Sequence, residues 1–160
     1  MNETRVLVAG IGNIFLGDDA FGVEAVRLLA GRAFPPGVTV RDFGIRGLDL
    51  CYALESCRAA ILVDAAPRGR APGTLTVLEP EVAPHSPQLP EPHRMTPDAV
   101  LARLAPGARP ARIRIVTCEP ESLEPDPDGL SPAVRAAAEA AGPLICRLVE
   151  DLLAEVGDRA

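Results

Sequence analysis

The stretch that decides the fold of this chain is Val6-Leu7-Val8-Ala9-Gly10-Ile11-Gly12-Asn13. Its first four residues form a continuous apolar run that ends at a glycine, a pattern typical of a buried strand in a parallel sheet. The residues that follow, up to Asp18, form a loop, and Asp18 or Asp19 can cap a helix that runs to about Ala30. The stretch therefore predicts a strand, a loop and a helix, the first unit of an α/β fold.

The same alternation continues along the chain. Strand, helix, strand, helix and strand succeed one another, which favours a parallel, right-handed α/β fold. A fourth strand follows the third so closely that we expect the two to pair like a hairpin. We expect strands at 6–9, 38–43, 59–63, 74–78 and 112–117, and helices from 18 or 19 to about 30, at 48–57, at 96–104 and from 131 onward.

The fold class that follows is α/β. We expect a three-layer α/β/α sandwich whose twisted, mostly parallel sheet has about five strands, one of them antiparallel. The dipeptide Gly142-Pro143 predicts a kink or a break in the last helix. Because neither an internal repeat nor a linker is apparent, we expect residues 1–160 to form a single domain.

The composition limits the classes of function. Hydrophobic residues make up 48% of the chain but aromatic residues only 3%, so the core must consist of Ala, Val, Leu and Ile. The net charge of −6 disfavours binding to phosphate backbones or anionic lipid, and we expect no nucleic-acid partner and no membrane partner. Residues 1–5 lead directly into the first strand, and we expect no signal peptide and no membrane span.

The cysteines point to a reducing compartment. Cys51, Cys57, Cys118 and Cys146 contain no C-x-x-C pair and no spacing typical of a zinc site. We therefore expect reduced, mostly buried thiols in a cytoplasmic protein, which we take to be a monomer.

The glycine-rich loop has two interpretations. Gly10 and Gly12 follow the first strand as in a dinucleotide-binding fingerprint, and Asp42 ends the second strand, where that fingerprint has an acidic residue. However, the third glycine position is occupied by Phe15. Two carboxylates at the start of the helix would also compete with a phosphate for its N-terminus. Nucleotide binding is therefore the weaker interpretation.

Acidic side chains follow the first and third strands. One of Asp18 and Asp19 is expected to cap the helix, which leaves the other free, and the spacing does not say which. Asp64 ends an apolar strand, where a carboxylate is costly unless it is paired, solvated or bound to a cation. In a sheet with strand order 2-1-3 the two loops lie side by side at the site where ligands bind. A histidine can come only from His85 or His93, and two carboxylates with an imidazole suit nickel or zinc.

Segments along nearly the whole chain resemble a known family in their order and their residues. They are Val-Ala-Gly-Ile-Gly-Asn at 8–13, Gly-Asp-Asp-Ala-Phe-Gly at 17–22, Asp-Phe-Gly-Ile-Arg-Gly-Leu at 42–48, Ile-Leu-Val-Asp-Ala at 61–65, Ala-Pro-Gly-Thr at 71–74, His-Arg-Met-Thr-Pro at 93–97, Cys-Glu-Pro-Glu-Ser-Leu-Glu at 118–124 and Gly-Leu-Ser at 129–131. Together they resemble the maturation endopeptidases of nickel–iron hydrogenases.

The resemblance implies a metal site. Its ligands would be an acid after the first strand, an acid after the third strand and a histidine, which here are Asp19, Asp64 and His93. His85 is left without a role. The family often has Glu at the position of Asp19, and the shorter side chain keeps the charge but would draw the loop closer. The resemblance also makes Asp19 and Asp64 candidates for catalysis.

A second group of residues is implied at the end of the second strand. Asp42 matches an acidic position that the resemblance suggests is catalytic, and the alternative is a turn residue before Gly44. Gly44, Arg46 and Gly47 are candidates for contacts with the substrate. The turn at Ile45-Arg46 departs from the Thr-rich version that is commoner in the family.

The implied function is removal of a C-terminal peptide from a hydrogenase large-subunit precursor after nickel insertion. In this hypothesis nickel is supplied by the substrate, bound to the cysteines of the precursor, although another divalent cation can occupy the site in isolation. Either the metal polarises the scissile carbonyl, or an aspartate acts as a base toward water. The alternatives are a non-catalytic nickel-recognition chaperone or scaffold and a nucleotide-binding domain. Glu119 and Glu124 receive no assigned chemistry.

Overall fold

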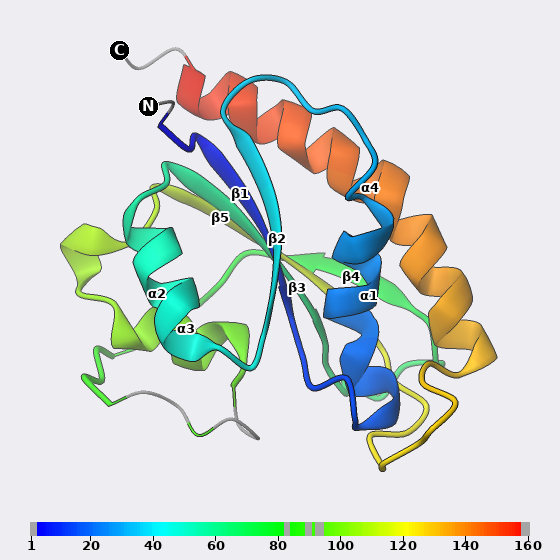
Figure 1. Cartoon of the computed structure of the whole chain (residues 1–160). Helices are drawn as coiled ribbons and strands as arrows, with labels where there is room; N and C mark the ends of the chain where they lie inside the picture. Colours follow the sequence, from blue (N-terminus) through cyan, green and yellow to red (C-terminus); the bar gives the residue numbers. More distant parts are fainter. Residues whose placement is uncertain (1–2, 82–83, 89–90, 92–94, 158–160) are drawn as a thin grey trace.

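One sheet of five strands runs through the computed structural model, which describes residues 3–81, 84–88, 91 and 95–157 (Figure 1). Its strand order is β2-β1-β3-β5-β4, and neighbouring strands are parallel except for the antiparallel pair β4–β5. The mostly parallel sheet and the predicted order 2-1-3 of its first three strands are therefore confirmed. The strands are β1 (Val6–Ile11), β2 (Val38–Gly44), β3 (Ala59–Ala65), β4 (Leu75–Leu78) and β5 (Arg112–Cys118).

Helices cover both faces of this sheet, as Figure 1 shows. On one face lie α1 (Phe21–Leu28) and α4 (Pro132–Gly157), and on the other lie α2 (Gly47–Glu55) and α3 (Pro97–Arg103). Short 3₁₀ helices, η1 (Gly17–Ala20) and η3 (Pro106–Ala108), lie in the connections. The predicted three-layer sandwich is confirmed. In the part of the chain that the structure describes, no helix combines the length and the apolar character needed to cross a membrane.

Alternating side chains of the central strands build two hydrophobic cores. Every residue of β1 and β3 is buried, because each strand has a neighbour on both sides and helices above and below. Successive side chains of a strand point to opposite faces, so Val6 and Val8 pack with α1 and α4, while Leu7 and Ala9 pack with α2 and α3. The continuous apolar runs that predicted buried strands thus fill both cores at once.

Two glycines bring α1 against the strands. A Cβ atom at Gly22, in the first turn of α1, would overlap the carbonyl oxygens of Val63 and Ile11. A Cβ atom at Gly10 would in turn overlap the carbonyl oxygen of Gly22. The helix backbone therefore rests directly on the ends of β1 and β3, which fixes the start of α1 relative to both strands.

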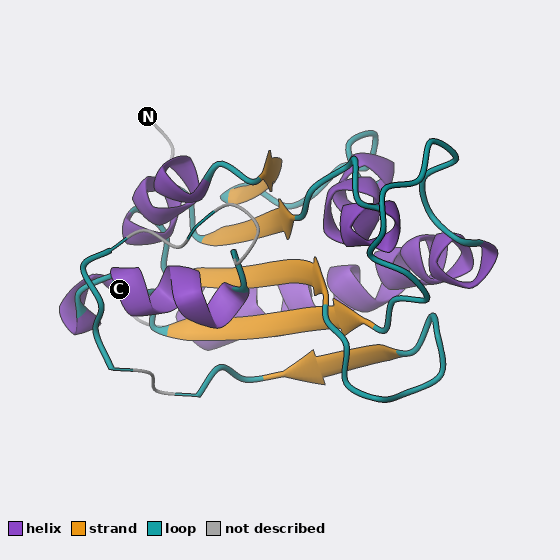
Figure 2. Cartoon of the chain, turned by 90° about the horizontal axis from the view of Figure 1, so that it is seen from below, coloured by secondary structure: helices purple, strands orange, loops and turns teal. Residues whose placement is uncertain are grey.

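The pairing of β4 differs from the expectation. β4 was expected to form a hairpin-like pair with β3, but it pairs with β5, and Leu75 lies opposite Cys118. β5 occupies the free edge of β3 over seven residues, from Ala59 opposite Arg112 to Ala65 opposite Cys118. The longer pairing displaces β4 to the sheet edge, where its arrow in Figure 2 points opposite to that of its neighbour.

The helix termini agree with the sequence in one case and differ in another. Thr96 caps α3, because its Oγ1 accepts a hydrogen bond from the N–H of Ala99 at 3.2 Å and Pro97 follows at the first helical position. Of the kink or break predicted at Gly142-Pro143, the break is wrong, since α4 continues through both residues, and the kink stays a prediction. Pro143 lies on the exposed side of α4, where water can solvate the carbonyl that proline leaves without a donor.

Candidate functional site

Two carboxylates share a hollow of about 150 Å³ at the carboxyl ends of β1 and β3. Asp64 is the penultimate residue of β3, and Asp19 belongs to η1, which connects the loop after β1 to α1. Parallel neighbours end at the same edge of a sheet, so the order β2-β1-β3 brings these two side chains together. The hollow is lined by Ile11, Gly12, Asp19, Ile45, Asp64, Ala65, Pro67, Met95, Thr96 and Leu123.

Asp64 lies in surroundings that disfavour its charge. The residue is only 5% exposed. Burial raises the pKa of its carboxyl well above the usual range and the neighbouring charge of Asp19 raises it further, whereas a backbone hydrogen bond from Ala65 lowers it. A cation placed in the hollow would offset both the cost of burying the charged carboxylate of Asp64 and its repulsion from Asp19.

Asp19 is half-buried and has one hydrogen bond that fixes its orientation. Its Oδ2 accepts from the backbone N–H of Asn13 at 2.8 Å. Burial raises the pKa of Asp19, although the hydrogen bond from Asn13 lowers it. Asp19 and Asp64 are thus two carboxyl groups of raised pKa in one cavity, an arrangement that can share a proton, hold a divalent cation or activate a water molecule.

The third predicted ligand, His93, lies outside the described residues. Met95 and Thr96, which follow it closely along the chain, line the carboxylate hollow. Within the described residues no group of three or more His, Cys, Asp or Glu side chains is arranged to hold a metal ion. The structure therefore brings together Asp19 and Asp64, and the assignment of His93 remains a prediction.

His85, which the sequence left without a role, has a structural one. Its Nδ1 lies 3.0 Å from the carbonyl oxygen of Ala102 and 3.1 Å from that of Leu104. Because carbonyl oxygens only accept hydrogen bonds, the proton must be on Nδ1. His85 attaches the proline-rich loop to the end of α3.

Asp18 does not cap a helix, contrary to the expectation for one residue of the pair. Its Oδ1 accepts from the N–H of Ser131 at 2.7 Å, and its Oδ2 accepts from the N–H of Glu121 at 2.8 Å, the N–H of Ser122 at 3.2 Å and the hydroxyl of Ser131 at 2.9 Å. The residue before α1 is Ala20, whose side chain cannot cap. The carboxylate of Asp18 joins the first loop to the segment between β5 and α4.

These hydrogen bonds determine how Asp18 titrates. Asp18 is 1% exposed. Burial alone would raise the pKa of Asp18, but the hydrogen bonds from Ser131, Glu121 and Ser122 together outweigh it and hold the pKa below its usual value. Asp18 is therefore a buried anion whose role is structural, and Asp19 is left to face the hollow.

Glu119 is a second structural acid, whose role could not be predicted from the sequence. Its carboxylate accepts hydrogen bonds from the backbone N–H groups of Arg68 at 2.6 Å and Gly69 at 3.0 Å. It thereby fixes the loop that leaves β3 after Asp64. Residues 118–131 thus support both loops of the site. Asp18 in the first loop accepts hydrogen bonds from this segment, and Glu119 of the segment accepts hydrogen bonds from the loop after β3.

The glycine-rich loop serves packing rather than phosphate binding. Gly12 has a φ of +148°, and a Cβ atom there would overlap the carbonyl oxygen of Asp19. Gly10 is in contact with Gly22 of α1, as described above. Both glycines are therefore required for the approach of η1 and α1 to β1, which removes the main argument for a dinucleotide site.

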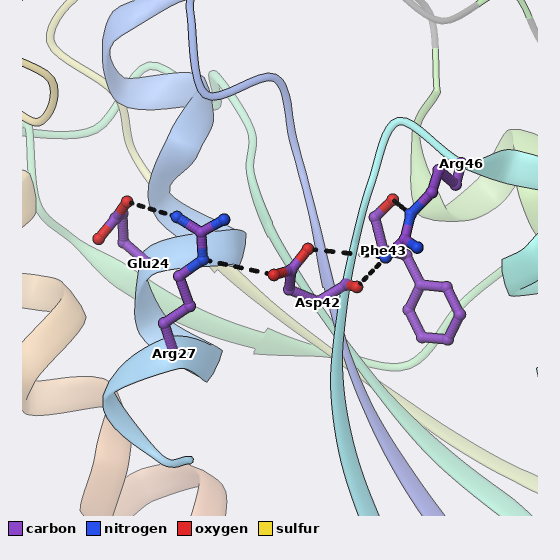
Figure 3. Close-up of polar contacts among 5 residues, drawn as sticks. All are labelled: Glu24, Arg27, Asp42, Phe43 and Arg46. Carbon is purple, nitrogen blue, oxygen red and sulfur yellow. Dashed lines mark hydrogen bonds and ion pairs between the residues drawn. The ribbon is translucent and has the colours of Figure 1, made fainter.

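Asp42 belongs to β2, which β1 separates from β3 and Asp64, and it takes part in a chain of ion pairs at the surface. Figure 3 shows its carboxylate between two arginines. Its Oδ2 accepts from Nε of Arg27 at 3.3 Å, and its Oδ1 lies 3.8 Å from the guanidinium of Arg46. Asp42 does not line the hollow of Asp19 and Asp64. It lines an adjoining one, so a catalytic role for Asp42 remains a prediction.

The turn after β2 separates the two hollows. Gly44 has a φ of +55°, and its carbonyl oxygen accepts from the N–H of Gly12 at 3.0 Å. The guanidinium of Arg46 is engaged with its own turn, where its Nε donates to the carbonyl oxygen of Phe43 at 3.2 Å. Gly47 begins α2 beside the sulfur atom of Met95. Of these candidates for substrate contacts, Gly44 lines the adjoining hollow.

A larger hollow of about 420 Å³ lies near the other end of the sheet, where β5 begins. Four of the charged side chains that line it form ion pairs. Arg112 and Arg114 pair with Glu155 at 3.3 and 3.1 Å, and Arg114 also pairs with Glu79 at 3.5 Å. The raised pKa values of Asp19 and Asp64 instead mark the smaller hollow as the candidate active site.

Comparisons with known proteins find relatives that match most of this chain. A family model described as hydrogenase maturation protease matches residues 23–148. The chain is 37% identical to the hydrogenase 2 maturation protease of Escherichia coli over 142 residues, covering 86% of this chain and 85% of that protein. It is 34% identical to the hydrogenase expression/formation protein HoxM of Azotobacter vinelandii over 161 residues, covering 98% of this chain and 76% of HoxM.

A solved structure shows the same architecture. The hydrogenase-maturating endopeptidase HybD from E. coli superposes with a TM-score of 0.75 at 32% sequence identity, covering 92% of this chain and 93% of that one. The α/β fold with its mixed sheet is therefore common to both proteins.

Proposed function

Since the chain belongs to the hydrogenase maturation protease family, we propose that it cuts the C-terminal extension from the large-subunit precursor of a nickel–iron hydrogenase once nickel is in place. It is a hydrolase of the endopeptidase class. The observation that carries the proposal is the pair Asp19 and Asp64, which face one hollow at the carboxyl edge of the sheet. Nickel enters as part of the substrate rather than as a resident cofactor.

Three side chains would recognise the nickel of the precursor. Asp19 and Asp64 supply carboxylate oxygens, and their mutual repulsion favours a cation between them. His93 supplies the imidazole. In the sequence His93 stands two positions before Met95, which lines the hollow. In the isolated protein another divalent cation can take the same position.

The cleavage step would use the same groups. With the precursor bound, the metal of the substrate polarises the scissile carbonyl, or one of the two aspartates takes a proton from the attacking water. Asp19 is the better candidate for the base, because it is the less buried of the two. The pKa of Asp64 is raised well above its usual value by burial, which favours its protonated form. Asp42 would assist from the adjoining hollow, where Arg27 and Arg46 hold it.

The cellular setting follows from the cysteines. All four are free, and Cys51, Cys57 and Cys118 are buried. Free thiols are typical of a reducing compartment, so we place the reaction in the cytoplasm and propose that the protein acts there as a monomer.

The test is incubation of the purified protein with precursor that either carries or lacks nickel. Mass spectrometry should show loss of the C-terminal peptide only from the nickel-loaded precursor. A protein that binds this precursor without shortening it would be a nickel-recognition scaffold, the alternative function.

Variants of the three side chains test the site itself. Asp19→Asn, Asp64→Asn and His93→Ala should stop processing while the circular dichroism spectrum stays native. Asp98→Asn, at an acidic position in the first turn of α3, is the matched control and should process normally. Normal cleavage by His93→Ala would remove the imidazole from the proposed ligand set.

A further inference from the structure

Large apolar side chains gather around the carboxylate hollow. Single exposed apolar residues are ordinary on a protein surface, but a group of them beside a cavity marks a binding site. Phe15 is 75% exposed, and Ile14, Ile45 and Leu123 are each about 40% exposed. We call these four residues, Ile14, Phe15, Ile45 and Leu123, the apolar rim.

The apolar rim connects two hollows. Ile45 and Leu123 line the carboxylate hollow, whereas Ile14, Phe15 and Ile45 line an adjoining hollow of about 180 Å³. Gly12 and Ile45 belong to both, so the two hollows share a wall. A ligand that enters the carboxylate hollow therefore passes Ile45 and can extend along the apolar rim.

The adjoining hollow suits an uncharged, apolar group. Its two charged side chains, Arg27 and Asp42, form an ion pair with each other at 3.3 Å (Figure 3). Val23 adds a further apolar side chain to its wall. With its charges paired and most of its remaining wall apolar, this hollow offers little to a charged ligand but removes an aliphatic or aromatic side chain from water.

The exposure of Phe15 is imposed by its turn. The N–H of Phe15 donates to Oδ1 of Asn13 at 2.9 Å, and the N–H of Asn13 donates to Oδ2 of Asp19 at 2.8 Å. The same segment is joined to the next turn by the hydrogen bond from Gly12 to Gly44. Phe15 is thus held outward by a turn that is attached to a candidate catalytic carboxylate, which keeps the apolar rim in register with the site.

We propose that Ile14, Phe15 and Ile45 form a subsite that binds an apolar side chain of the precursor next to the scissile bond. This inference rests on the proposed function and adds to it a determinant of substrate choice. Because the hollows share a wall and an extended chain advances about 3.3 Å per residue, the bound side chain lies within about three residues of the cut.

The test compares Phe15→Ser with a control, Leu28→Ser. Leu28 is also a large exposed apolar residue, at the end of α1, and lines neither hollow. Phe15→Ser should lower kcat/KM for the nickel-loaded precursor about tenfold or more and weaken its binding to a similar extent. Leu28→Ser should leave both unchanged. Both side chains are exposed, so both variants should keep the wild-type Tm.

A scan of the precursor identifies the occupant. Each apolar residue near the cleavage site is replaced by Ser, and each altered precursor is assayed with the wild type and with Phe15→Ser. One position should reduce kcat/KM with the wild type and have little further effect with Phe15→Ser, because the two changes remove the same contact. Losses that add at every position would show that Phe15 binds nothing near the cut.

The outcomes separate this inference from the proposed function. If the wild type binds and cuts the precursor and Phe15→Ser does so equally well, the subsite is wrong and the proposed function stands. If the wild type binds without cutting, the binding loss of Phe15→Ser still supports the subsite while the endopeptidase role fails. If the wild type neither binds nor cuts, both are overturned.

Discussion

Replacement of Asp18 by Asn tests whether this residue is structural and its neighbour functional. Asp18→Asn keeps the shape of the side chain but removes its charge and one of its two acceptor oxygens. If the amide oxygen takes the place of Oδ2, it keeps the hydrogen bonds from Glu121, Ser122 and the Ser131 hydroxyl. The amide nitrogen then faces the N–H of Ser131, which in the wild type donates to Oδ1 of Asp18 at 2.7 Å. Two donors would meet in a buried site.

The cost of this change follows from the hydrogen bonds. One buried donor without an acceptor costs about 1–3 kcal/mol, and the three remaining bonds lose the extra strength that a charged acceptor gives. We expect the free energy of unfolding to fall by about 3 kcal/mol. For a domain of this size that corresponds to a decrease in Tm of roughly 6–12 °C.

The assay is urea unfolding followed by circular dichroism, together with thermal melting, and the control is Asp19→Asn. Among the described residues Asp19 accepts a single hydrogen bond, from Asn13, which an amide oxygen can keep. Asp19→Asn should therefore be at least as stable as the wild type but fail to process the precursor. Asp18→Asn should show the loss of stability, and at temperatures where it is folded it should retain processing.

The reasoning about Asp18 is refuted if Asp18→Asn and the wild type unfold at the same urea concentration. It is equally refuted if Asp19→Asn loses as much stability as Asp18→Asn, because the two neighbouring carboxylates would then have the same role.

Further predictions concern charge and burial. Asp64→Asn should raise the Tm by a few degrees, because it replaces a buried carboxyl whose ionised form is disfavoured by burial and by Asp19 with a neutral side chain. It should also abolish processing, and an unchanged or lower Tm in thermal melting would contradict the reasoning. The pKa of Asp18 is held below its ordinary value of 3.8, so Asp18 stabilises the fold above that pH and the contribution is lost as the pH falls through the lower folded pKa. The difference in unfolding free energy between the wild type and Asp18→Asn should accordingly narrow below about pH 4, as measured by urea titration at several pH values. Burial raises the pKa of Cys57 and of Cys118 to about 12, so native protein treated with iodoacetamide at mild alkaline pH should be alkylated first at the half-buried Cys146; early modification of Cys57, seen by peptide mass spectrometry, would count against the buried core.

The parts of the fold that depend on local pattern could be predicted from the sequence. The apolar runs of β1 and β3 indicated buried strands, and Thr96-Pro97 indicated the start of α3. The pairing of β4 could not be predicted in this way, because it depends on competition for one edge of β3. β5, which is farther away in sequence, pairs with β3 over a longer stretch than β4 has residues, and local proximity gives no measure of that.

In the site, too, some features could be predicted from the sequence and others depend on residues that are distant in sequence. The edge that Asp19 and Asp64 share follows from strand order, which the alternation of strands and helices already predicted. The roles of Asp18 and Glu119 depend on partners that are distant in sequence: Asp18 binds Ser131, and Glu119 binds the N–H groups of Arg68 and Gly69. No local pattern distinguishes such an acid from a helix cap. The segments 118–124 and 129–131 resembled the family, but the resemblance assigned no chemistry to Glu119.

The contact between Gly22 of α1 and the ends of β1 and β3 has a consequence for how this protein can diverge. Main chain touches main chain there, so the spacing of the two layers does not depend on which aliphatic residues fill the cores. Val, Leu and Ile can be exchanged over generations while η1, and Asp19 with it, stays in place. One added methyl group at Gly22 would separate the layers instead. The geometry of the site thus depends on the absence of a side chain at Gly22.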